Sequence, residues 1–369
     1  MNKKSILALS ITGALLASNA NAANKVADAR GNAMGNTGVA SADYLTSAFY
    51  NPALAAIYNN EDDFGVFIAV GAVVNDQDDM ITTFDDLQDN IANNNETAIN
   101  ENLNELNGAE PLSVNAGLGI AIALPSSVVS SNLFVRGYTE IAAMTDITIG
   151  DYTTSYVNMV AFGYVEAGLA LAKQYEIAGE RVSFGITPKY QQMTTYAQRV
   201  TVENYDLDDY DQSETTKNAF NFDLGAVWYK QNFRAALAIK DLLAQEIDVS
   251  DNLGNIDGTY KLDTQVTVGI AYSSDYFVAA IDADLTKQTR FENTYTDDDT
   301  QFVRFGIEGN AWGWAQLRAG YEIDLEETLD NSITAGIGIS PFDLVSIDVA
   351  GSYAGENQAG VSANLAFTF

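Results

Sequence analysis

The sequence of 369 residues contains no cysteine and no histidine. Disulfide bonds, thiolate chemistry, imidazole-based catalytic triads and the usual zinc sites are therefore excluded, and we do not expect an enzyme. Basic residues are scarce too, because 18 Lys and Arg stand against 50 Asp and Glu, a formal net charge of −32. So acidic a chain is repelled by nucleic acid, and no nucleic-acid partner is expected.

Long apolar segments are missing as well. The run from Ile6 to Ala17 is too short to cross a bilayer as a helix, and no later stretch reaches ~20 apolar residues. Lys3 and Lys4 precede this run and Ala20-Asn21-Ala22 follows it, which predicts a secretory signal peptide over residues 1–22. Without that peptide the net charge is −34, from 16 basic and 50 acidic residues. If the exported chain lies in a membrane, it crosses as strands.

The last ten residues alternate in character. One face carries Val361, Ala363, Leu365, Phe367 and Phe369, and the other carries Ser362, Asn364, Ala366 and Thr368. This pattern suits a strand with lipid on one side and a polar lumen on the other, although a half-buried strand of a soluble sandwich also alternates. The ending at Phe367 and Phe369 resembles the signal that the outer-membrane assembly machinery reads, so we expect that machinery as a partner.

Alternation and turn signals predict about fourteen strands, each long enough for the ~9–11 residues of a tilted spanning strand. They are 64–74, 112–124, 131–143, 157–174, 181–203, 217–230, 232–249, 258–273, 275–292, 300–312, 314–325, 331–340, 343–354 and 358–369. Tight turns alternate with longer acidic loops along the sequence. In bacterial outer-membrane β-barrels, the short turns lie on the periplasmic side. The predicted fold class is all-β, a transmembrane antiparallel barrel over residues 63–369.

Aromatic residues collect at the predicted periplasmic ends, as expected because Trp and Tyr prefer the membrane interface. They are Trp228, Tyr229, Phe233, Tyr272, Tyr276, Phe277, Trp312, Trp314 and Phe342. We therefore expect the chain in the outer membrane of a Gram-negative bacterium, surrounded by lipid.

Charged residues occupy the face opposite the apolar stripe. They are Asp223, Asp263, Asp282, Asp284, Arg304, Glu308, Arg318, Glu322 and Asp348. A Lys or Arg that faces lipid at the midplane costs ~2–4 kcal/mol, so this face is predicted to line the lumen. Two interpretations stay open: an ion-pair network that braces the wall, or a charged constriction.

Residues 23–62 precede the first strand and do not alternate. Gly31, Gly35 and Gly38 dot a run of small residues, and Asn51-Pro52 indicates a turn followed by a helix start. The glycine spacing is superficially that of a nucleotide-binding loop, but no strand precedes it. We expect this segment to fold compactly inside the lumen.

A small-residue segment that ends in Asn51-Pro52-Ala53, just before about fourteen strands and a terminal Phe, resembles the FadL/TodX family of outer-membrane channels for hydrophobic compounds. The chain is more similar still to the TraF-like outer-membrane family associated with conjugal transfer, in which 185–190 looks like a strand motif. The resemblance implies a hatch that plugs the barrel and a hydrophobic small-molecule ligand such as a fatty acid. The hatch positions it implies are Gly31, Gly35, Gly38, Asn51, Pro52 and Ala53.

Three functions stay open at this point. They are uptake of hydrophobic molecules, a cation-preferring diffusion pore, and a structural or surface component of conjugal transfer with no transported ligand. An unrelated thioredoxin-like protein also bears the TraF name, and the absence of cysteine excludes that redox role.

Residues 76–110 form a second extra segment, between the first two strands and therefore outside the cell. Apolar residues recur there at helical spacing, at Ile81, Phe84, Leu87, Ile91, Ile99, Leu103 and Leu106. We expect a helical insertion that either caps the barrel's own loops or forms a lid or hydrophobic capture surface.

Three loops are dense in carboxylates. These are Asp206, Asp208, Asp209 and Asp211, then Asp297, Asp298 and Asp299, then Glu322, Asp324, Glu326, Glu327 and Asp330. Such loops can bind Ca²⁺ or Mg²⁺, but none has the spacing of a defined calcium loop, and solvated acidity is the alternative. No other cofactor is expected.

Pro188 interrupts a well-patterned strand. Proline removes one donor from the ladder, so a local break in pairing is expected. In a FadL-like barrel such a kink opens the wall sideways, and Lys189 would then face the lumen beside the gap. A harmless bulge is the alternative.

Overall fold

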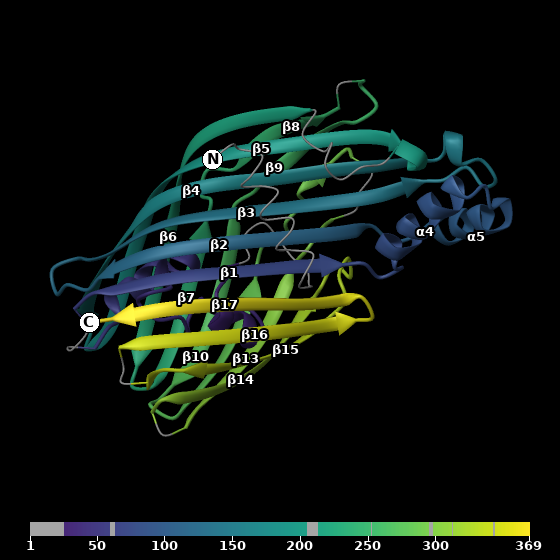
Figure 1. The fold of residues 1–369 in the computed structure, drawn as a ribbon. Helices are drawn as coiled ribbons and strands as arrows, with labels where there is room; N and C mark the ends of the chain where they lie inside the picture. Colours follow the sequence, from purple (N-terminus) through teal and green to yellow (C-terminus); the bar gives the residue numbers. More distant parts are fainter. Residues whose placement is uncertain are drawn as a thin grey trace.

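The computed structural model describes residues 26–59, 63–204, 213–251, 253–294, 298–311, 313–341 and 344–369. Within them, fourteen antiparallel strands form one closed barrel (Figure 1). The predicted all-β class, with about fourteen strands, is therefore confirmed. Several predicted features lie outside the described residues: the signal peptide 1–22, Asp206, Asp208, Asp209, Asp211, Asp297, Trp312 and Phe342.

The barrel strands follow one another around the wall nearly in chain order. They are β1 (Gly65–Asn75), β2 (Leu112–Leu124), β3 (Ser130–Asp146), β4 (Tyr156–Ile177), β5 (Glu180–Thr201), β6 (Glu214–Lys230), β7 (Phe233–Lys240), β10 (Gln265–Ser273), β11 (Phe277–Asp284), β13 (Phe302–Ala311), β14 (Ala315–Asp324), β15 (Ser332–Ile339), β16 (Val345–Gly355) and β17 (Gln358–Thr368). Pairing of β1 with β17, from Gly65 with Thr368 to Asn75 with Gln358, closes the barrel.

Inward and outward side chains differ sharply. Leu317 on the outer face is 66% exposed, whereas the adjacent Arg318 is 8% exposed and faces the lumen. Apolar side chains are exposed all along the outer wall, which suits a lipid environment. Exposed aromatic residues gather near the tight turns, at Trp228, Phe233, Tyr276, Phe277 and Trp314. We call this end of the barrel the short-turn end, and the opposite one the long-loop end.

Three of the predicted barrel strands are wrong over the half nearer the long-loop end, which does not belong to the barrel wall. The segment 232–249 breaks after β7 into β8 (Gln245–Ser250), 258–273 splits into β9 (Asp257–Leu262) and β10, and 275–292 splits into β11 and β12 (Phe291–Glu292). The outer pieces form a separate sheet in the order β12-β9-β8, here called the inner sheet. Asp263 consequently lies in the turn between β9 and β10 and not on a barrel strand.

The inner sheet leaves the wall because its apolar face has another partner. Tyr260 stacks on Phe162 of β4 with ring centroids 3.6 Å apart, and Ile247 and Val249 pack in the same cluster as Met193 of β5. The chain turns out of the wall at Asp241, whose φ is +50°. The sheet therefore covers the inward faces of β4 and β5.

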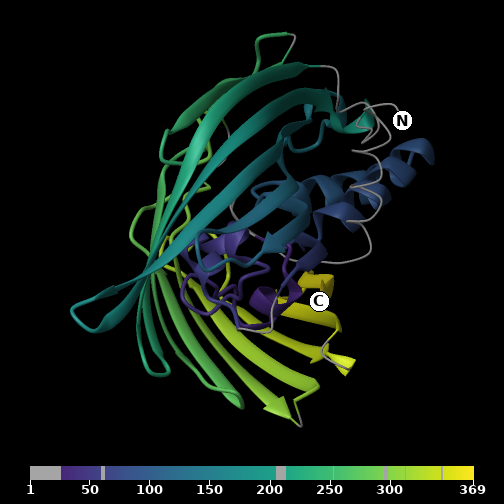
Figure 2. The same cartoon turned by 90° about the vertical axis from the view of Figure 1, so that its left-hand side faces the viewer.

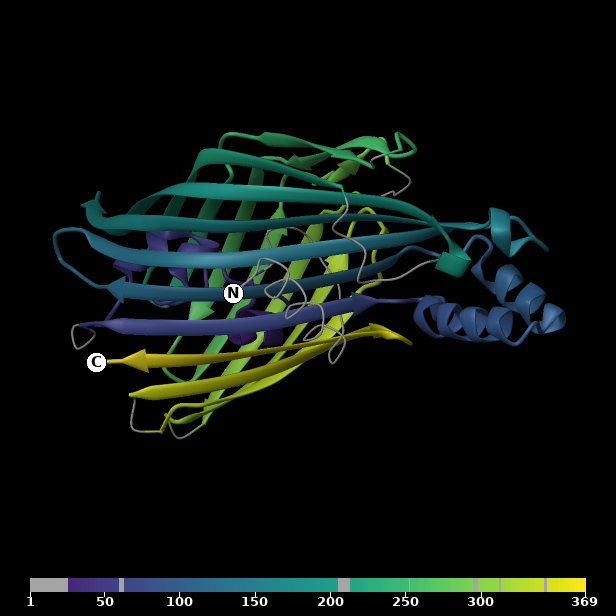
Figure 3. The same ribbon diagram turned by 45° about the horizontal axis from the view of Figure 1, so that its top comes forward.

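Two helices, α4 (Met80–Ala92) and α5 (Glu96–Leu106), extend beyond the strand ends (Figure 3). Asn95 begins α5 as its N-cap. The apolar stripe, including Phe84, Leu87 and Leu103, is buried against Ala143, Val157 and Val202 at the barrel rim. Ile81 was expected in this stripe but is 36% exposed, and Met80 takes its place. Within the described residues, no helix is both long and apolar enough to cross a membrane.

Residues 26–59, here called the hatch, lie inside the barrel (Figure 2). They contain α2 (Ala29–Ala33), α3 (Ser47–Tyr50) and the 3-10 helix η1 (Pro52–Ala56). Asp28 caps α2, and the Asn51 carboxamide oxygen caps η1 by accepting from the Ala53 N–H at 3.0 Å. Two further short 3-10 helices, η2 (Tyr152–Thr154) and η3 (Val202–Asn204), lie at the long-loop end.

Candidate functional site: a tethered hatch and a series of cavities

Glycines on the wall bring the hatch backbone into direct contact with the strands. A Cβ on Gly320 would lie 2.0 Å from the Gly35 nitrogen, and one on Gly306 would lie 2.4 Å from the Met34 oxygen. Gly35 has φ of +65°, and a Cβ there would lie 2.6 Å from the Phe305 carbonyl oxygen. Only glycine permits this approach, because neither backbone has room for a side chain.

Three of the lumen carboxylates predicted from the sequence hold the hatch. Asp282 Oδ2 accepts hydrogen bonds from the Gly38 and Val39 N–H groups at 2.7 and 2.9 Å. Glu322 Oε2 accepts from Asn36 Nδ2 at 3.1 Å. Glu308 Oε2 accepts from Arg30 Nε at 2.9 Å, which brings an arginine of the hatch to the wall. The plug is thus bound through charge-assisted hydrogen bonds, which are stronger than neutral ones.

The remaining lumen charges pair along the wall. Arg304 lies 2.9 Å from Glu322 Oε2 and 3.0 Å from Asp284 Oδ2. Arg318 lies 2.6 Å from Glu308 Oε2 and 2.5 Å from Asp348 Oδ1. These contacts connect β11, β13, β14 and β16, an arrangement that favours the bracing interpretation over a charged constriction.

The Asn51-Pro52-Ala53 turn rests on the opposite wall. A Cβ on Gly185 of β5 would lie 2.4 Å from the Ala53 nitrogen, so the turn lies directly on that strand. Ser183 Oγ donates to the Ala53 carbonyl at 2.6 Å, and Asn51 Nδ2 donates to the Leu237 carbonyl at 3.3 Å. Gly185 opens the segment 185–190 that the family resemblance pointed to.

At Gly31 and Gly38 the absence of a side chain leaves room for Tyr50 inside the hatch, while the Gly38 N–H also binds Asp282 on the wall. A Cβ at Gly31 would lie 1.8 Å from the Tyr50 hydroxyl, and one at Gly38 would lie 2.1 Å from the Tyr50 ring. Tyr50 donates to Asp28 Oδ2 at 3.2 Å, and Asp28 also accepts from the backbone of Arg30 and Gly31. Burial raises the pKa of Asp28 to about 6, with the nearby Asp43 adding to the effect.

The wall is interrupted at Pro188. The β4–β5 ladder pairs Gly168 with Lys189 and resumes only at Leu171 with Ile186, without a change of register. Pairing with β6 is continuous through Pro188 and Phe222. The gap therefore affects only the β4 side of β5, and β5 is also the strand on which the Asn51-Pro52-Ala53 turn lies. Whether it opens to the membrane stays a prediction.

Lys189 lies in the lumen, fully buried among acids. Its Nζ is 2.8 Å from both Asp223 Oδ1 and Asp241 Oδ1, and 3.4 Å from Glu166 Oε2. Arg136 Nε contacts Glu166 at 2.5 Å. Because Asp241 is where the chain leaves the wall for the inner sheet, Lys189 connects the strand with the gap to the start of that sheet.

Several residues that hold the hatch were missed by sequence reasoning. They are Ser183, Gly306, Gly320, Thr334, Gly336 and Asn364. The available signal was glycine at inward positions of strand interiors, which indicates close approach of another backbone. Without the course of the hatch, that signal does not say what approaches.

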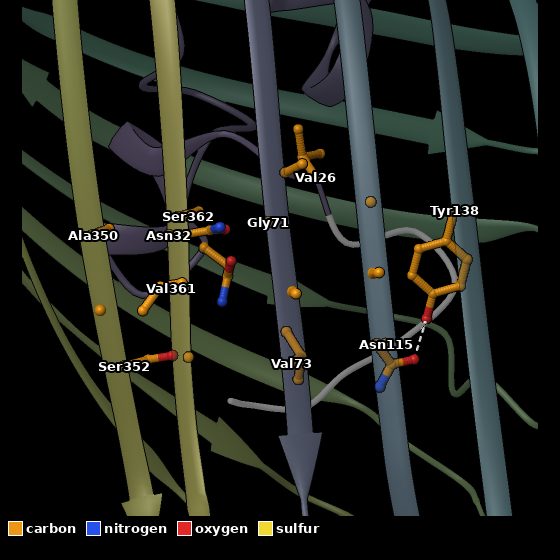
Figure 4. A pocket seen from close by; sticks show the side chains of 17 residues that line it. Val26, Asn32, Gly71, Val73, Asn115, Tyr138, Ala350, Ser352, Val361 and Ser362 are labelled. Atoms are coloured by element: carbon orange, nitrogen blue, oxygen red, sulfur yellow. Dashed lines mark hydrogen bonds between the residues drawn. The ribbon is translucent and has the colours of Figure 1, made fainter. Parts of the chain in front are cut away.

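Three cavities follow one another from the long-loop end. The outer cavity, about 380 Å³, lies between the rim and the loop 326–330. The middle cavity, about 30 Å³, adjoins the start of the hatch at Val26, and the inner cavity, about 60 Å³, lies beside Asp282. Asn115 borders the outer and middle cavities, and Val26 borders the middle and inner ones. Figure 4 shows the middle cavity, with the 2.8 Å hydrogen bond from Tyr138 to Asn115 at its edge.

The alternative of Ca²⁺ or Mg²⁺ sites in the acidic loops gains no support from the geometry. Across the part of the chain that the structure describes, no group of three or more acidic residues is placed to hold a metal ion. Asp298 instead accepts from the Arg290 and Phe291 backbone, and Asp299 contacts Lys287.

Solved structures share this architecture. A toluene transporter of Ralstonia pickettii, TbuX, has 13% identity and a TM-score of 0.54, with 94% of this chain and 98% of that chain covered. The toluene transporter TodX of Pseudomonas putida has 12% identity and a TM-score of 0.53, with 95% and 99% covered. A FadL homologue of Pseudomonas aeruginosa has 11% identity and a TM-score of 0.50, with 95% and 97% covered. At these identities the likeness concerns the fold.

Among curated proteins, none matches the chain. A family model does match, over residues 48–284, from the end of the hatch through β11. Its description is F plasmid transfer operon, TraF, protein. The matched region covers more than half of the sequence, and the barrel and the cysteine-free composition agree with the resemblance found from the residues. The chain is a member of this TraF family.

Proposed function

We propose that the protein is an outer-membrane channel through which hydrophobic small molecules enter the cell, with the long-loop end outside. The observation that carries the proposal is the hatch, which fills the lumen and is tethered on both sides. An open diffusion pore needs no such segment. The shared fold with two toluene transporters and a FadL homologue supports the same assignment.

The cavities suggest the route. A ligand enters the outer cavity, passes Asn115 and Tyr138, and reaches the small-residue lining of the middle cavity. Further passage requires either a displacement of the hatch or an exit through the wall. The ladder gap at Pro188 is the candidate for the second route, which would deliver an apolar molecule into the membrane and avoid the aqueous periplasm.

Growth of a deletion strain on oleate or toluene as sole carbon source, with and without the intact gene, tests the proposal. We expect growth to depend on the intact chain. Liposome swelling with arabinose provides the matched permeability test, in which the full chain is expected to be closed and a chain lacking residues 26–59 open. Free arabinose passage through the intact chain would instead identify a diffusion pore.

The family description favours one second candidate, a surface component of conjugal transfer without a transported ligand. Its test is the conjugation frequency of the same deletion strain as plasmid donor. A conjugation defect combined with normal growth on oleate and toluene would replace the channel proposal with this one.

A further inference from the structure

Lys240 is a buried cation that has no carboxylate partner among the described residues. It is the last residue of β7, is 9% exposed and lines the inner cavity. Its Nζ donates to the Phe49 carbonyl of the hatch. Lys189, by contrast, has three carboxylates within 3.4 Å of its Nζ. Charged groups in a protein interior are nearly always paired, so the environment of Lys240 needs an explanation.

Asp241, the next residue, is a fully buried carboxylate with one oxygen unused. Its Oδ1 accepts from Gln191 Nε2 at 2.9 Å and from Asn221 Nδ2 at 3.2 Å, and it lies 2.8 Å from Lys189 Nζ. Its Oδ2 is buried as well, but it has no donor among the described residues. A carboxylate oxygen that is buried without a donor is costly. Oδ2 therefore indicates an interaction that is not made in the seated arrangement of the hatch.

Lys240 and Asp241 are two halves of an ion pair that is not formed while the hatch is seated. The acids that act most strongly on the Lys240 charge are Asp223 and Asp241, and of these two only Asp241 has a buried oxygen without a donor. Asp282 on the inner cavity also has one, but its effect on Lys240 is smaller. The inner cavity, of about 60 Å³, leaves space beside the lysine side chain. The Phe49 carbonyl thus holds the amine that Asp241 lacks.

Displacement of the hatch takes the Phe49 carbonyl away from Lys240. An ammonium group left in the interior without an acceptor is strongly unfavourable, so the side chain has to find a new one. We infer that Lys240 is a latch with two positions, which donates to the Phe49 carbonyl when the hatch is seated and pairs with Asp241 Oδ2 when the hatch is displaced. The ion pair formed in the second position offsets part of the contacts that the hatch loses, and it therefore favours release.

The latch also connects the hatch to the wall at Pro188. Lys189, the residue after this proline, binds the other oxygen of the Asp241 carboxylate. A second cation on that carboxylate repels Lys189 and weakens its hold beside the gap in the ladder. Both exits named for the proposed channel therefore depend on one carboxylate. The inference rests on the proposed function for this use, whereas the latch itself is a property of the hatch and is measured without any ligand.

The sign of one substitution separates a latch from a simple tether. The readout is the maleimide labelling rate of Ser41→Cys, a hatch position that is 4% exposed in a chain without cysteine, in the purified full-length chain in nonionic micelles. A latch predicts that Lys240→Gln slows labelling about tenfold, because the displaced hatch loses a charge-assisted pair. If Lys240 only holds the seated hatch, the same change accelerates labelling, and the latch is overturned. Lys240→Met, which adds no buried amide, gives a second measurement of the sign.

A double-mutant cycle identifies the partner. Asp241→Asn is expected to slow labelling about tenfold as well, and Lys240→Gln/Asp241→Asn to be no slower than either single variant, because the pair is already lost. An unchanged rate in Asp241→Asn, or single effects that multiply to about a hundredfold, would overturn the latch. The matched control is Lys217→Gln on β6, since the Lys217 amine also donates to a backbone carbonyl, that of Glu246, but away from the hatch. Heat-modifiable migration on gels verifies that each barrel is folded.

The outcomes separate the latch from the channel proposal, because labelling needs no transported molecule. Faster labelling in Lys240→Gln, combined with growth on oleate or toluene that depends on the intact chain, would end the latch and keep the channel. Slower labelling in both single variants without further slowing in the double variant, combined with no growth phenotype and no hatch-dependent permeability, would keep the latch and end the channel.

Discussion

The substitution Gly320→Ala tests whether the hatch is held by backbone contact with the wall. In an ordinary strand a change from glycine to alanine is harmless or stabilising. Here the new methyl carbon would lie 2.0 Å from the Gly35 nitrogen and 2.3 Å from the Met34 carbonyl carbon. Relief to even 3.0 Å requires a movement of about 1 Å, and the hatch is the part free to move.

The expected cost follows from that movement. Overpacking of this kind costs roughly 1–3 kcal/mol. A displacement of about 1 Å also breaks the 2.9 Å bond from the Gly35 N–H to Thr334 Oγ1, worth about 1 kcal/mol. Together these destabilise the seated hatch by roughly 2–4 kcal/mol, which raises the population of the displaced hatch about 30- to 700-fold.

Because the chain has no cysteine of its own, displacement of the hatch can be measured by labelling a single introduced thiol. Ser41→Cys places a near-isosteric thiol at a position that is 4% exposed in the seated hatch, and its maleimide labelling rate reports displacement. Gly309→Ala on β13 is the control, because nothing lies within 4 Å of a Cβ there. Heat-modifiable migration on gels verifies that each barrel is folded. Equal labelling rates in the Gly320→Ala, Gly309→Ala and unmodified backgrounds would refute the backbone-contact argument.

Three further predictions concern the gap, the pH response and the last strand. Pro188→Val restores a ladder donor and is expected to abolish uptake of oleate or toluene while heat-modifiable migration is retained; unchanged uptake in a folded variant would dispose of the lateral route. Burial raises the pKa of Asp28 from 3.8 to about 6, so the seated hatch binds a proton more tightly than the displaced one. The stabilisation that protonated Asp28 gives the seated hatch is full below about pH 4 and is lost as the pH rises through 6. We therefore expect the maleimide labelling rate of Ser41→Cys, divided by that of free cysteine at the same pH, to increase by up to about 100-fold by pH 7.5. In an Asp28→Asn background this increase with pH is expected to be absent. Phe369→Ala is expected to slow assembly, measured as unfolded chain by pulse-chase and gel shift, and normal assembly kinetics would argue against a terminal signal.

The barrel was predictable because lipid and lumen impose opposite chemistry on successive residues. Leu317, which is exposed, and Arg318, which is buried in the lumen, illustrate this on β14. Alternation failed at 232–249, 258–273 and 275–292 because β8 and β9 also bury one face and alternate just as regularly. What separates them from the wall is the turn at Asp241, where the backbone takes φ of +50° without a glycine to announce it.

The sequence predicts which charged residues line the lumen, but it does not predict which residues they bind. Alternation along the strands predicts that Asp282, Glu308 and Glu322 face inward, but it does not predict their hydrogen-bond partners. Those partners, including Arg30 and the Gly38 N–H, come from a segment more than 200 residues away in sequence. The glycines of the hatch stand out because they lie in a run of small residues that does not alternate, whereas their complements on the wall, such as Gly306 and Gly320, look like any strand glycine.

The reach of the hatch constrains the order in which the molecule folds. Its first helix hydrogen-bonds through the Ala29 N–H to Asn364 on the final strand, 335 residues later, while its last turn rests on β5 and β6. A chain that is still emerging therefore carries a plug with only half of its partners. Contacts of such long sequence separation form late and slowly. Because Asn364 lies on β17, the strand that closes the barrel against β1, the hatch gains its full set of wall partners no earlier than the barrel closes.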